Sequence, residues 1–396
     1  MASVDLLAQL EAGTCHEAFV PLRDVFLDNF ARRSEVGGAV AVYVDGACLV
    51  DLWAGRVVRD QKPSGPWQAD TIIRMMSINK AMTALCAHRL ADQGLLDYDA
   101  PVARYWPDFA QAGKGAITVR QLMSGLAALV YPDEVPAGSA YDWDRVVEGL
   151  ARQAPNWPPG TRGAYHSSTY GHLVGELVRR VSGRRPSQVF AEEIGRPFGI
   201  DYHFRVAPGD RARVSEVLSN PGSTTYSAIA RGGETKLGRA WRILPDLDPA
   251  ARDRPEALGV EMPSGFGRGN ARAIGKLFAI LGEGGRWEGR TLVSERAIRA
   301  MSTLAWDNVC PLTDRSYRYG MGMFLNTPGL VPMGPNPAAF GHPGAGGAIG
   351  FCDPRARLAF SYCTAFMCEG AGVGERCEAL IRAAFEGLSR FRGGRA

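Results

Sequence analysis

The sequence lacks the features that would tie the chain to a membrane or to nucleic acid. None of its 396 residues belongs to an apolar run of roughly 20 residues, the length that spans a bilayer. The first thirty residues carry charges such as Asp5 and Glu11 in place of the apolar core of a signal peptide. Basic residues exceed acidic ones by only four and form no long stripe. We therefore expect neither a membrane nor a nucleic acid as a partner.

Disulfide and metal patterns are also missing. The eight cysteines form no C-x-x-C pair and are too sparse for a disulfide scaffold, which predicts reduced thiols in the cytoplasm. Most histidines show no ligand spacing with cysteines or carboxylates: His16, His88, His166, His172 and His203. No glycine-rich phosphate loop occurs either. The sequence thus predicts no metal and no cofactor, and nothing in it indicates an oligomeric state.

What is present is the composition of an ordinary globular protein, with 46% hydrophobic and 22% charged residues. Apolar residues at helical spacing predict a helix over 20–33. The runs 39–44 and 47–53 are typical of strands, and Asp45-Gly46 between them predicts a tight hairpin turn. A long amphipathic helix is expected over 77–93, because an apolar stripe continues up to the stop signal Gly94.

The middle of the chain differs from its two ends. Residues 111–260 contain helical pieces at 171–181 and 186–194 among many prolines and glycines. The tail returns to helices and strands, which we expect at 271–281 (helix), 338–340, 348–352 and 358–364 (strands) and 373–388 (helix). The economical model is an α+β fold in which both chain ends build one antiparallel sheet flanked by helices. Its domains would be 1–110 with 261–396, and a mostly helical inserted domain at 111–260.

The first chemical motif is an S-x-x-K formed by Ser77 and Lys80 at the start of the long helix. Three residues are about one helical turn, so the hydroxyl and the amine share a face. A buried ammonium loses solvation, its pKa falls, and the neutral amine can take a proton from the serine. The alternative is a serine N-cap followed by a solvated lysine. With five lysines and twenty serines, chance supplies roughly a quarter of one such motif, which favours chemistry.

The second motif is Tyr165-His166-Ser167, which follows a proline-rich turn. A phenol titrates near pH 10, and a neighbouring ammonium favours its anion. Tyr165 could then act as general base for Ser77 and afterwards as acid for the leaving group. The sequence leaves open whether Lys80 or Tyr165 holds the proton, and a structural tyrosine is the alternative.

The third motif is the glycine-rich stretch 341–347, Gly-His-Pro-Gly-Ala-Gly-Gly, between strand-like runs. Glycine-rich turns are usually only turns. Glycines also let a substrate approach the backbone closely, and a neighbouring strand edge offers N–H groups to a developing oxyanion. This stretch is therefore a candidate wall of a catalytic site.

In their order and distances, these three motifs resemble the serine β-lactamase and D,D-peptidase superfamily, most of all class C β-lactamases and family VIII carboxylesterases. The resemblance spans nearly the whole chain. It implies that Ser77 is the acylated nucleophile, that Lys80 and Tyr165 activate it, and that the backbone N–H groups of Ser77 and Ala345 form the oxyanion hole. It also implies substrate contacts from three further residues: Ser167, His342 and Gly344.

Two departures from the family pattern bear on the activity. His342 stands where β-lactamases and D,D-peptidases carry a lysine, and Ser167 stands where many β-lactamases carry asparagine. Both favour a cofactor-free carboxylesterase for short-chain esters over the alternative, a β-lactamase or D-amino-acid peptidase or acyltransferase. A non-catalytic binding module is disfavoured because Ser77, Lys80 and Tyr165 are all kept, and the expected partner is a small ester or amide.

Overall fold

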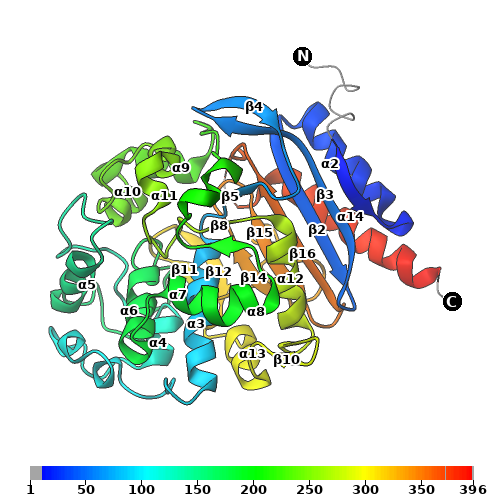
Figure 1. Ribbon diagram of the computed structural model, residues 1–396. Coiled ribbons are helices and arrows are strands. Elements are labelled where there is room, and N and C mark those ends of the chain that lie inside the picture. The colour runs from blue at the N-terminus through cyan, green and yellow to red at the C-terminus, as the bar shows by residue number, and fades with distance from the viewer. Residues whose placement is uncertain (1–10, 371, 395–396) are drawn as a thin grey trace.

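The computed structural model describes residues 11–370 and 372–394, and within them both ends of the chain build one large antiparallel sheet. The sheet is ten-stranded over these residues (Figure 1). Its order is β1 (Ala12–Cys15), β3 (Ala47–Arg59), β2 (Gly37–Val44), β16 (Leu358–Thr364), β15 (Ile349–Asp353), β14 (Phe340–Pro343), β13 (Phe324–Leu325), β12 (Arg315–Tyr319) and β11 (Trp306–Cys310), with β4 (Lys62–Pro66) paired to β3.

The chain ends meet where β2 pairs with β16, from Val44 opposite Leu358 to Gly38 opposite Thr364. Every residue of β2, β15 and β16 is buried, so these strands are covered on both faces. This explains why they are mostly apolar and do not alternate between apolar and polar residues. The expected hairpin is present, with Asp45 and Gly46 at φ of 49° and 79°.

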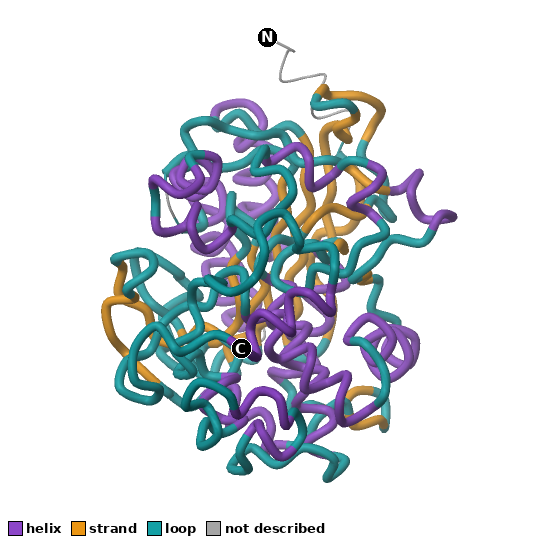
Figure 2. Tube along the Cα trace, turned by 90° about the vertical axis from the view of Figure 1, so that its left-hand side faces the viewer, coloured by secondary structure: helices purple, strands orange, loops and turns teal. Residues whose placement is uncertain are grey.

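Helices pack on both faces of the sheet. On one side, α2 (Val20–Arg32) follows the short helix η1 (Glu17–Phe19) and packs against α14 (Gly374–Gly393). On the other side, α12 (Ala271–Gly282) lies on β2, β15 and β16, with α3 (Ile78–Asp92) and α13 (Glu295–Ser302) beside it (Figure 1). Figure 2 shows the strands running through the interior between these helices. The helices thus form the outer layers of an α+β fold.

The middle of the chain is mostly helical and lies on the α3 side of the sheet (Figure 1). Its α-helices are α4 (Val119–Met123), α5 (Trp143–Arg152), α6 (Tyr170–Ser182), α7 (Pro186–Phe190), α8 (Arg196–Phe198), α9 (Thr224–Ala230), α10 (Lys236–Trp241) and α11 (Pro255–Leu258). Its shorter turns are η2 (Val102–Arg104), η3 (Pro107–Ala110), the π-turn η4 (Ala191–Gly195), η5 (Pro208–Arg213), η6 (Gly232–Glu234) and η7 (Pro249–Asp253).

Two small sheets complete the described residues. One has the order β6 (Tyr202–His203), β8 (Arg268–Gly269), β5 (Ile72–Arg74) and β7 (Val214–Ser215), and the other pairs β9 (Arg286–Trp287) with β10 (Arg290–Thr291). The first joins the segment before Ser77 to the inserted part of the chain. It therefore fixes where that serine lies.

The α+β architecture expected from the sequence is confirmed, with local differences. The strand expected at 338–340 lies at Phe340–Pro343, and the final helix runs from Gly374 to Gly393 instead of over 373–388. Strands β11 to β13 were not expected. The division into domains at 110 and 260 stays a prediction.

Among the described helices, none is long and apolar enough to cross a bilayer. The expectation about signal peptides falls partly on residues 1–10, which lie outside the described part of the chain.

Candidate active site

Ser77 lies at the turn that joins β5 to α3. The residue before it, Met76, has φ of 52°, a left-handed conformation that is uncommon for a non-glycine residue and typical of strained functional turns. Ser77 occupies the N-cap position of α3, yet its side chain makes no capping hydrogen bond. The hydroxyl is thus not used as a helix cap, which was the structural alternative for this serine.

Lys80 points from the first turn of α3 toward that hydroxyl. Its Nζ lies 3.1 Å from Ser77 Oγ and 2.7 Å from the carbonyl oxygen of Ser264, and the side chain is fully buried. No carboxylate forms an ion pair with it within the described residues. Burial lowers the pKa of the Lys80 amine well below its ordinary value, because the ammonium loses its hydration without gaining a counter-charge.

Tyr165 completes the cluster from the segment before α6. The Lys80 Nζ lies 5.0 Å from the centre of the Tyr165 ring. Burial raises the pKa of the Tyr165 phenol well above its ordinary value, and hydrogen bonding with Ser77 offsets part of that rise. The lowered pKa of Lys80 and the raised pKa of Tyr165 both favour the uncharged forms, a neutral amine beside a neutral phenol. For the question that the sequence leaves open, these two pKa directions favour the state in which Tyr165 keeps its proton and Lys80 is neutral.

The glycine-rich motif approaches the Ser77 turn at Gly344. A Cβ atom there would lie 2.7 Å from the carbonyl oxygen of Met75 and 3.2 Å from the Cβ of Met76, so this close approach requires glycine. The next residue, Ala345, lies on the cavity wall with Ser77. Within residues 11–370 and 372–394, the backbone N–H groups of Ser77 and Ala345 donate no hydrogen bond. Two free donors therefore lie on either side of this contact.

His342 does not line the cavity and lies behind two residues that do, Phe324 and Tyr165. Its ring is fully buried against Phe324 (5.0 Å between ring centres) and Tyr165 (6.1 Å), because β14 continues through this residue and directs the side chain into the core. Its Nδ1 lies 2.8 Å from the Pro343 carbonyl oxygen, whereas Nε2 has no partner among the described residues. Burial, reinforced by Lys80, lowers the pKa of His342 to about 3, so the ring is neutral.

One cavity of about 440 Å³ opens over these residues, a size suited to a small molecule. Of the residues expected from the sequence, it is lined by Ser77, Tyr165, Ser167, Gly344 and Ala345. Lys80 reaches Ser77 from beneath. The Ser167 hydroxyl accepts a hydrogen bond of 2.9 Å from the Trp241 indole.

Sequence reasoning missed several residues of this site. The Ser264 carbonyl holds Lys80, and three side chains of the inserted part line the cavity: Tyr226, Trp241 and Arg252. The sequence alone could not single out Arg252, because its burial depends on contacts between segments that are far apart in the chain.

A helix-borne serine and lysine, joined by a tyrosine from an inserted helical region beneath an antiparallel sheet, define a β-lactamase-like serine hydrolase. Comparison with known proteins agrees. The family model described as Beta-lactamase matches residues 22–378, and the chain belongs to that family.

Three related proteins are similar over most of their length. The chain is 32% identical to "Esterase/beta-lactamase LipL" of Mycobacterium tuberculosis, covering 88% of this chain and 81% of that protein. It is 35% identical to a family VIII carboxylesterase of known structure, with a TM-score of 0.85 over 95% of this chain and 99% of the other. A penicillin-binding protein homologue from Caulobacter crescentus is 33% identical, with a TM-score of 0.83 and coverage of 95% and 99%.

Proposed function

We propose that this serine hydrolase is a carboxylesterase that acts on short-chain esters through an acyl-enzyme on Ser77. The observation that carries the proposal is the buried Lys80 amine, 3.1 Å from a serine hydroxyl that caps no helix. A nucleophile, a base within hydrogen-bond reach and a third polar group around them are the elements of covalent catalysis. The esterase names of two relatives support the same conclusion.

In the first step, Ser77 Oγ attacks the ester carbonyl carbon while its proton passes to Lys80 Nζ. The carbonyl oxygen becomes an oxyanion that accepts hydrogen bonds from the N–H groups of Ser77 and Ala345. The Tyr165 phenol, kept protonated by burial, gives its proton to the departing alkoxide and regains one from the Lys80 ammonium. The alcohol leaves and the acyl group stays on Ser77.

In the second step, a water molecule replaces the alcohol and the same groups act in reverse. The water loses a proton to the pair formed by Lys80 and Tyr165, its oxygen attacks the acyl carbon, and Ser77 Oγ leaves with that proton. The products are a carboxylic acid and the free enzyme. Neither step requires a cofactor.

An esterase is preferred to the alternative, a β-lactamase or D-amino-acid peptidase, because of the third motif. His342 stands where those enzymes carry a lysine, and here it is neutral and does not line the cavity. The motif itself therefore supplies no positive charge to a β-lactam carboxylate. The similarity to a penicillin-binding protein homologue supports the β-lactamase or peptidase alternative.

The test is a hydrolysis screen of p-nitrophenyl esters of increasing acyl length, run beside a chromogenic cephalosporin. We expect kcat/KM on the esters to exceed that on the cephalosporin by orders of magnitude, and Ser77→Ala to abolish both. Equal or faster cephalosporin hydrolysis would make the β-lactamase alternative the better description.

We further propose that the enzyme works in the cytoplasm on a small-molecule substrate. All eight cysteines are unpaired, and six of them are buried, as expected of thiols kept reduced. Fractionation of cells that produce the protein, followed by immunodetection, tests the location.

A further inference from the structure

Three arginines cluster around a single carboxylate beside the catalytic cavity, and two of them, Arg74 and Arg252, line that cavity. Arg74, Arg252 and Arg268 are 2%, 4% and 0% exposed, so all three guanidinium groups lie away from bulk water. The carboxylate is that of Asp253, which is also buried. Since arginine does not lose its proton in proteins, this cluster carries an excess of positive charge.

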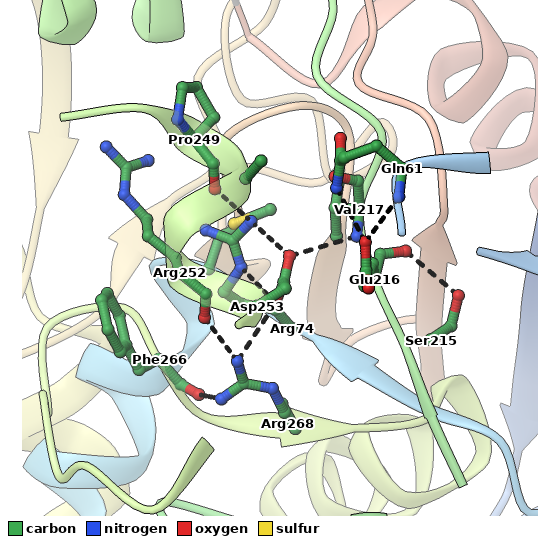
Figure 3. A network of polar contacts seen from close by, with 12 residues as sticks. Gln61, Arg74, Ser215, Glu216, Val217, Pro249, Arg252, Asp253, Phe266 and Arg268 are labelled. Carbon is green, nitrogen blue, oxygen red and sulfur yellow. Dashed lines mark hydrogen bonds and ion pairs between the residues drawn. The ribbon is translucent and has the colours of Figure 1, made fainter. Parts of the chain in front are cut away.

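Two of these arginines form ion pairs with the Asp253 carboxylate. Arg74 binds both Asp253 oxygens, at 3.1 and 2.8 Å, and Arg268 binds Oδ1 at 3.1 Å (Figure 3). Their remaining contacts include the Tyr226 hydroxyl for Arg74 and the Phe266 carbonyl oxygen for Arg268. In Figure 3, the Arg252 guanidinium points away from this carboxylate.

Arg252 is left without a counter-charge. Its Nε and Nη2 are buried and have no hydrogen-bond partner among the described residues, and no described carboxylate pairs with it. Burial lowers the pKa of Arg252 from its ordinary value. Tyr226 hydrogen-bonds to the Arg252 guanidinium, but this leaves Nε and Nη2 without acceptors. Buried charged donors without acceptors are strongly unfavourable, so a folded protein that keeps two of them points to an absent acceptor.

The position of Arg252 connects it to the nucleophile. Its guanidinium lies over the rings of Tyr226 (4.8 Å) and Trp241 (5.8 Å). The Tyr226 hydroxyl contacts the Sδ atom of Met76 at 3.0 Å. Met76 is the residue directly before Ser77 in the chain. Arg252 and Ser77 line the same cavity of about 440 Å³. Both residues are therefore accessible to a molecule bound in this cavity.

We propose that Arg252 binds a carboxylate of the substrate, so that the ester or amide cleaved at Ser77 is anionic. This inference rests on the proposed hydrolase function and names its substrate class. The planar guanidinium fork matches a carboxylate through two parallel hydrogen bonds, and the two aromatic rings exclude water from the contact. Arg252 is thus a specificity-determining residue supplied by η7, a different segment from the glycine-rich motif.

The main test compares esters that differ only in a terminal carboxylate. Mono-p-nitrophenyl esters of glutaric, adipic and pimelic acid are paired with p-nitrophenyl esters of the monocarboxylic acids of equal carbon number. For the best-fitting length, we expect a higher kcat/KM on the acid ester. Arg252→Met should reduce the ratio of acid to neutral ester on the order of 30-fold or more.

The matched control is Arg254→Met, two residues further on, whose exposed guanidinium pairs with Asp246 at 2.9 Å. It should keep the wild-type ratio. The melting temperature of Arg252→Met should equal or exceed that of the wild type, because the substitution removes an unpaired buried charge. The proposal is overturned if folded Arg252→Met keeps the wild-type ratio of acid to neutral ester. It is also overturned if the wild type prefers no carboxylate-bearing substrate.

A carboxylate on the leaving group would bind through the same guanidinium, so N-acetyl-D-alanyl-D-alanine forms a separate arm. Turnover of this peptide that depends on Arg252, without a preference among the acid esters, supports the proposal and places the carboxylate on the leaving side.

A binding measurement separates failure of this site from failure of the proposed function. Calorimetry on Ser77→Ala uses monomethyl adipate against neutral dimethyl adipate, with and without Arg252→Lys, a variant that keeps the charge and loses the fork. Tighter binding of the monoester that weakens in Arg252→Lys supports the site even if the wild type hydrolyses no ester. Equal binding of the two esters overturns it, even if neutral esters are hydrolysed.

Discussion

Replacing Gly344 with alanine tests whether the contact between the glycine-rich motif and the Ser77 turn builds the oxyanion hole. The added methyl group would lie 2.7 Å from the Met75 carbonyl oxygen, 3.1 Å from the Ala348 Cβ and 3.2 Å from the Met76 Cβ. Backbone on one side and a strained turn on the other leave no flexible side chain to give way. The two segments must therefore move apart by about 0.7 Å to reach ordinary contact.

That movement carries the Ala345 N–H group away from the Ser77 N–H group. Hydrogen bonds to an oxyanion are effective only when donors lie about 2.7–3.1 Å from it, and losing one donor costs about 3–4 kcal/mol of transition-state stabilisation. We expect Gly344→Ala to lower kcat on a p-nitrophenyl ester by a factor on the order of 100, with little change in KM. Overpacking should also lower the free energy of unfolding by about 1–3 kcal/mol.

The assay is steady-state hydrolysis at a temperature well below the melting point of the variant, with circular dichroism to verify folding. Gly209→Ala is the matched control, since a Cβ there meets no atom within 4 Å and its φ is not left-handed. It should keep the wild-type kcat. A folded Gly344→Ala enzyme with wild-type kcat would refute the reasoning, because the clash would then have been absorbed without disturbing the donors.

Further predictions concern the three groups around the nucleophile. Ser77→Ala should remove ester turnover and leave the melting temperature nearly unchanged, since no cap is lost; a serine-reactive phosphonate should label the Ser77 peptide, and labelling elsewhere would refute the assignment. In single-turnover experiments, Tyr165→Phe should slow acylation by a factor on the order of 100 to 10,000, and Lys80→Ala by at least as much. The double variant should be little worse than the poorer single one, and simple additivity would contradict a shared proton network. Because burial lowers the pKa of Lys80 and the neutral amine is the reactive form, acylation should rise with pH through that lowered pKa and then level off; a rate that rises only near the ordinary pKa of lysine would contradict a buried neutral base.

The sequence was sufficient for the parts of the site that depend on short spacing. One helical turn separates Ser77 from Lys80, so their proximity follows from helix geometry alone. Tyr165 and the glycine-rich motif were located through their resemblance to a known family, since no local rule brings together residues 88 positions apart (77 and 165). The central strands were identified because β2 and β16 are mostly apolar, as suits strands that are covered on both faces.

The orientation of His342 could not be predicted, for a reason rooted in strand geometry. Successive side chains of a strand point to opposite faces, so the direction of a side chain can be inferred only once the strand is known to include that residue. The strand was expected to end at Phe340, and the substrate contact of His342 was implied by the family resemblance. Because β14 continues to Pro343, the pleat turns His342 into the core while Pro343 lines the cavity.

Arg252 illustrates a second limit. In the sequence it is one of several arginines in a polar stretch, and nothing local distinguishes it from Arg254, which is exposed and paired. The difference arises only when η7 packs beside Tyr226 and Trp241, far away in the chain. A charged side chain without a counter-charge can be recognised only when all of its neighbours in the fold are known.

The site concentrates features that each oppose folding. Met76 holds a left-handed backbone conformation, and Lys80 is buried without a carboxylate. Between its lowered native pKa and the ordinary lysine pKa, the native state binds fewer protons than the unfolded chain, so this group makes stability rise with pH within that window. The surrounding sheet is buried on both faces, and its stability offsets the cost of this strain and desolvation. In the proposed mechanism, the same burial that destabilises the Lys80 ammonium makes the neutral amine available as a base for Ser77.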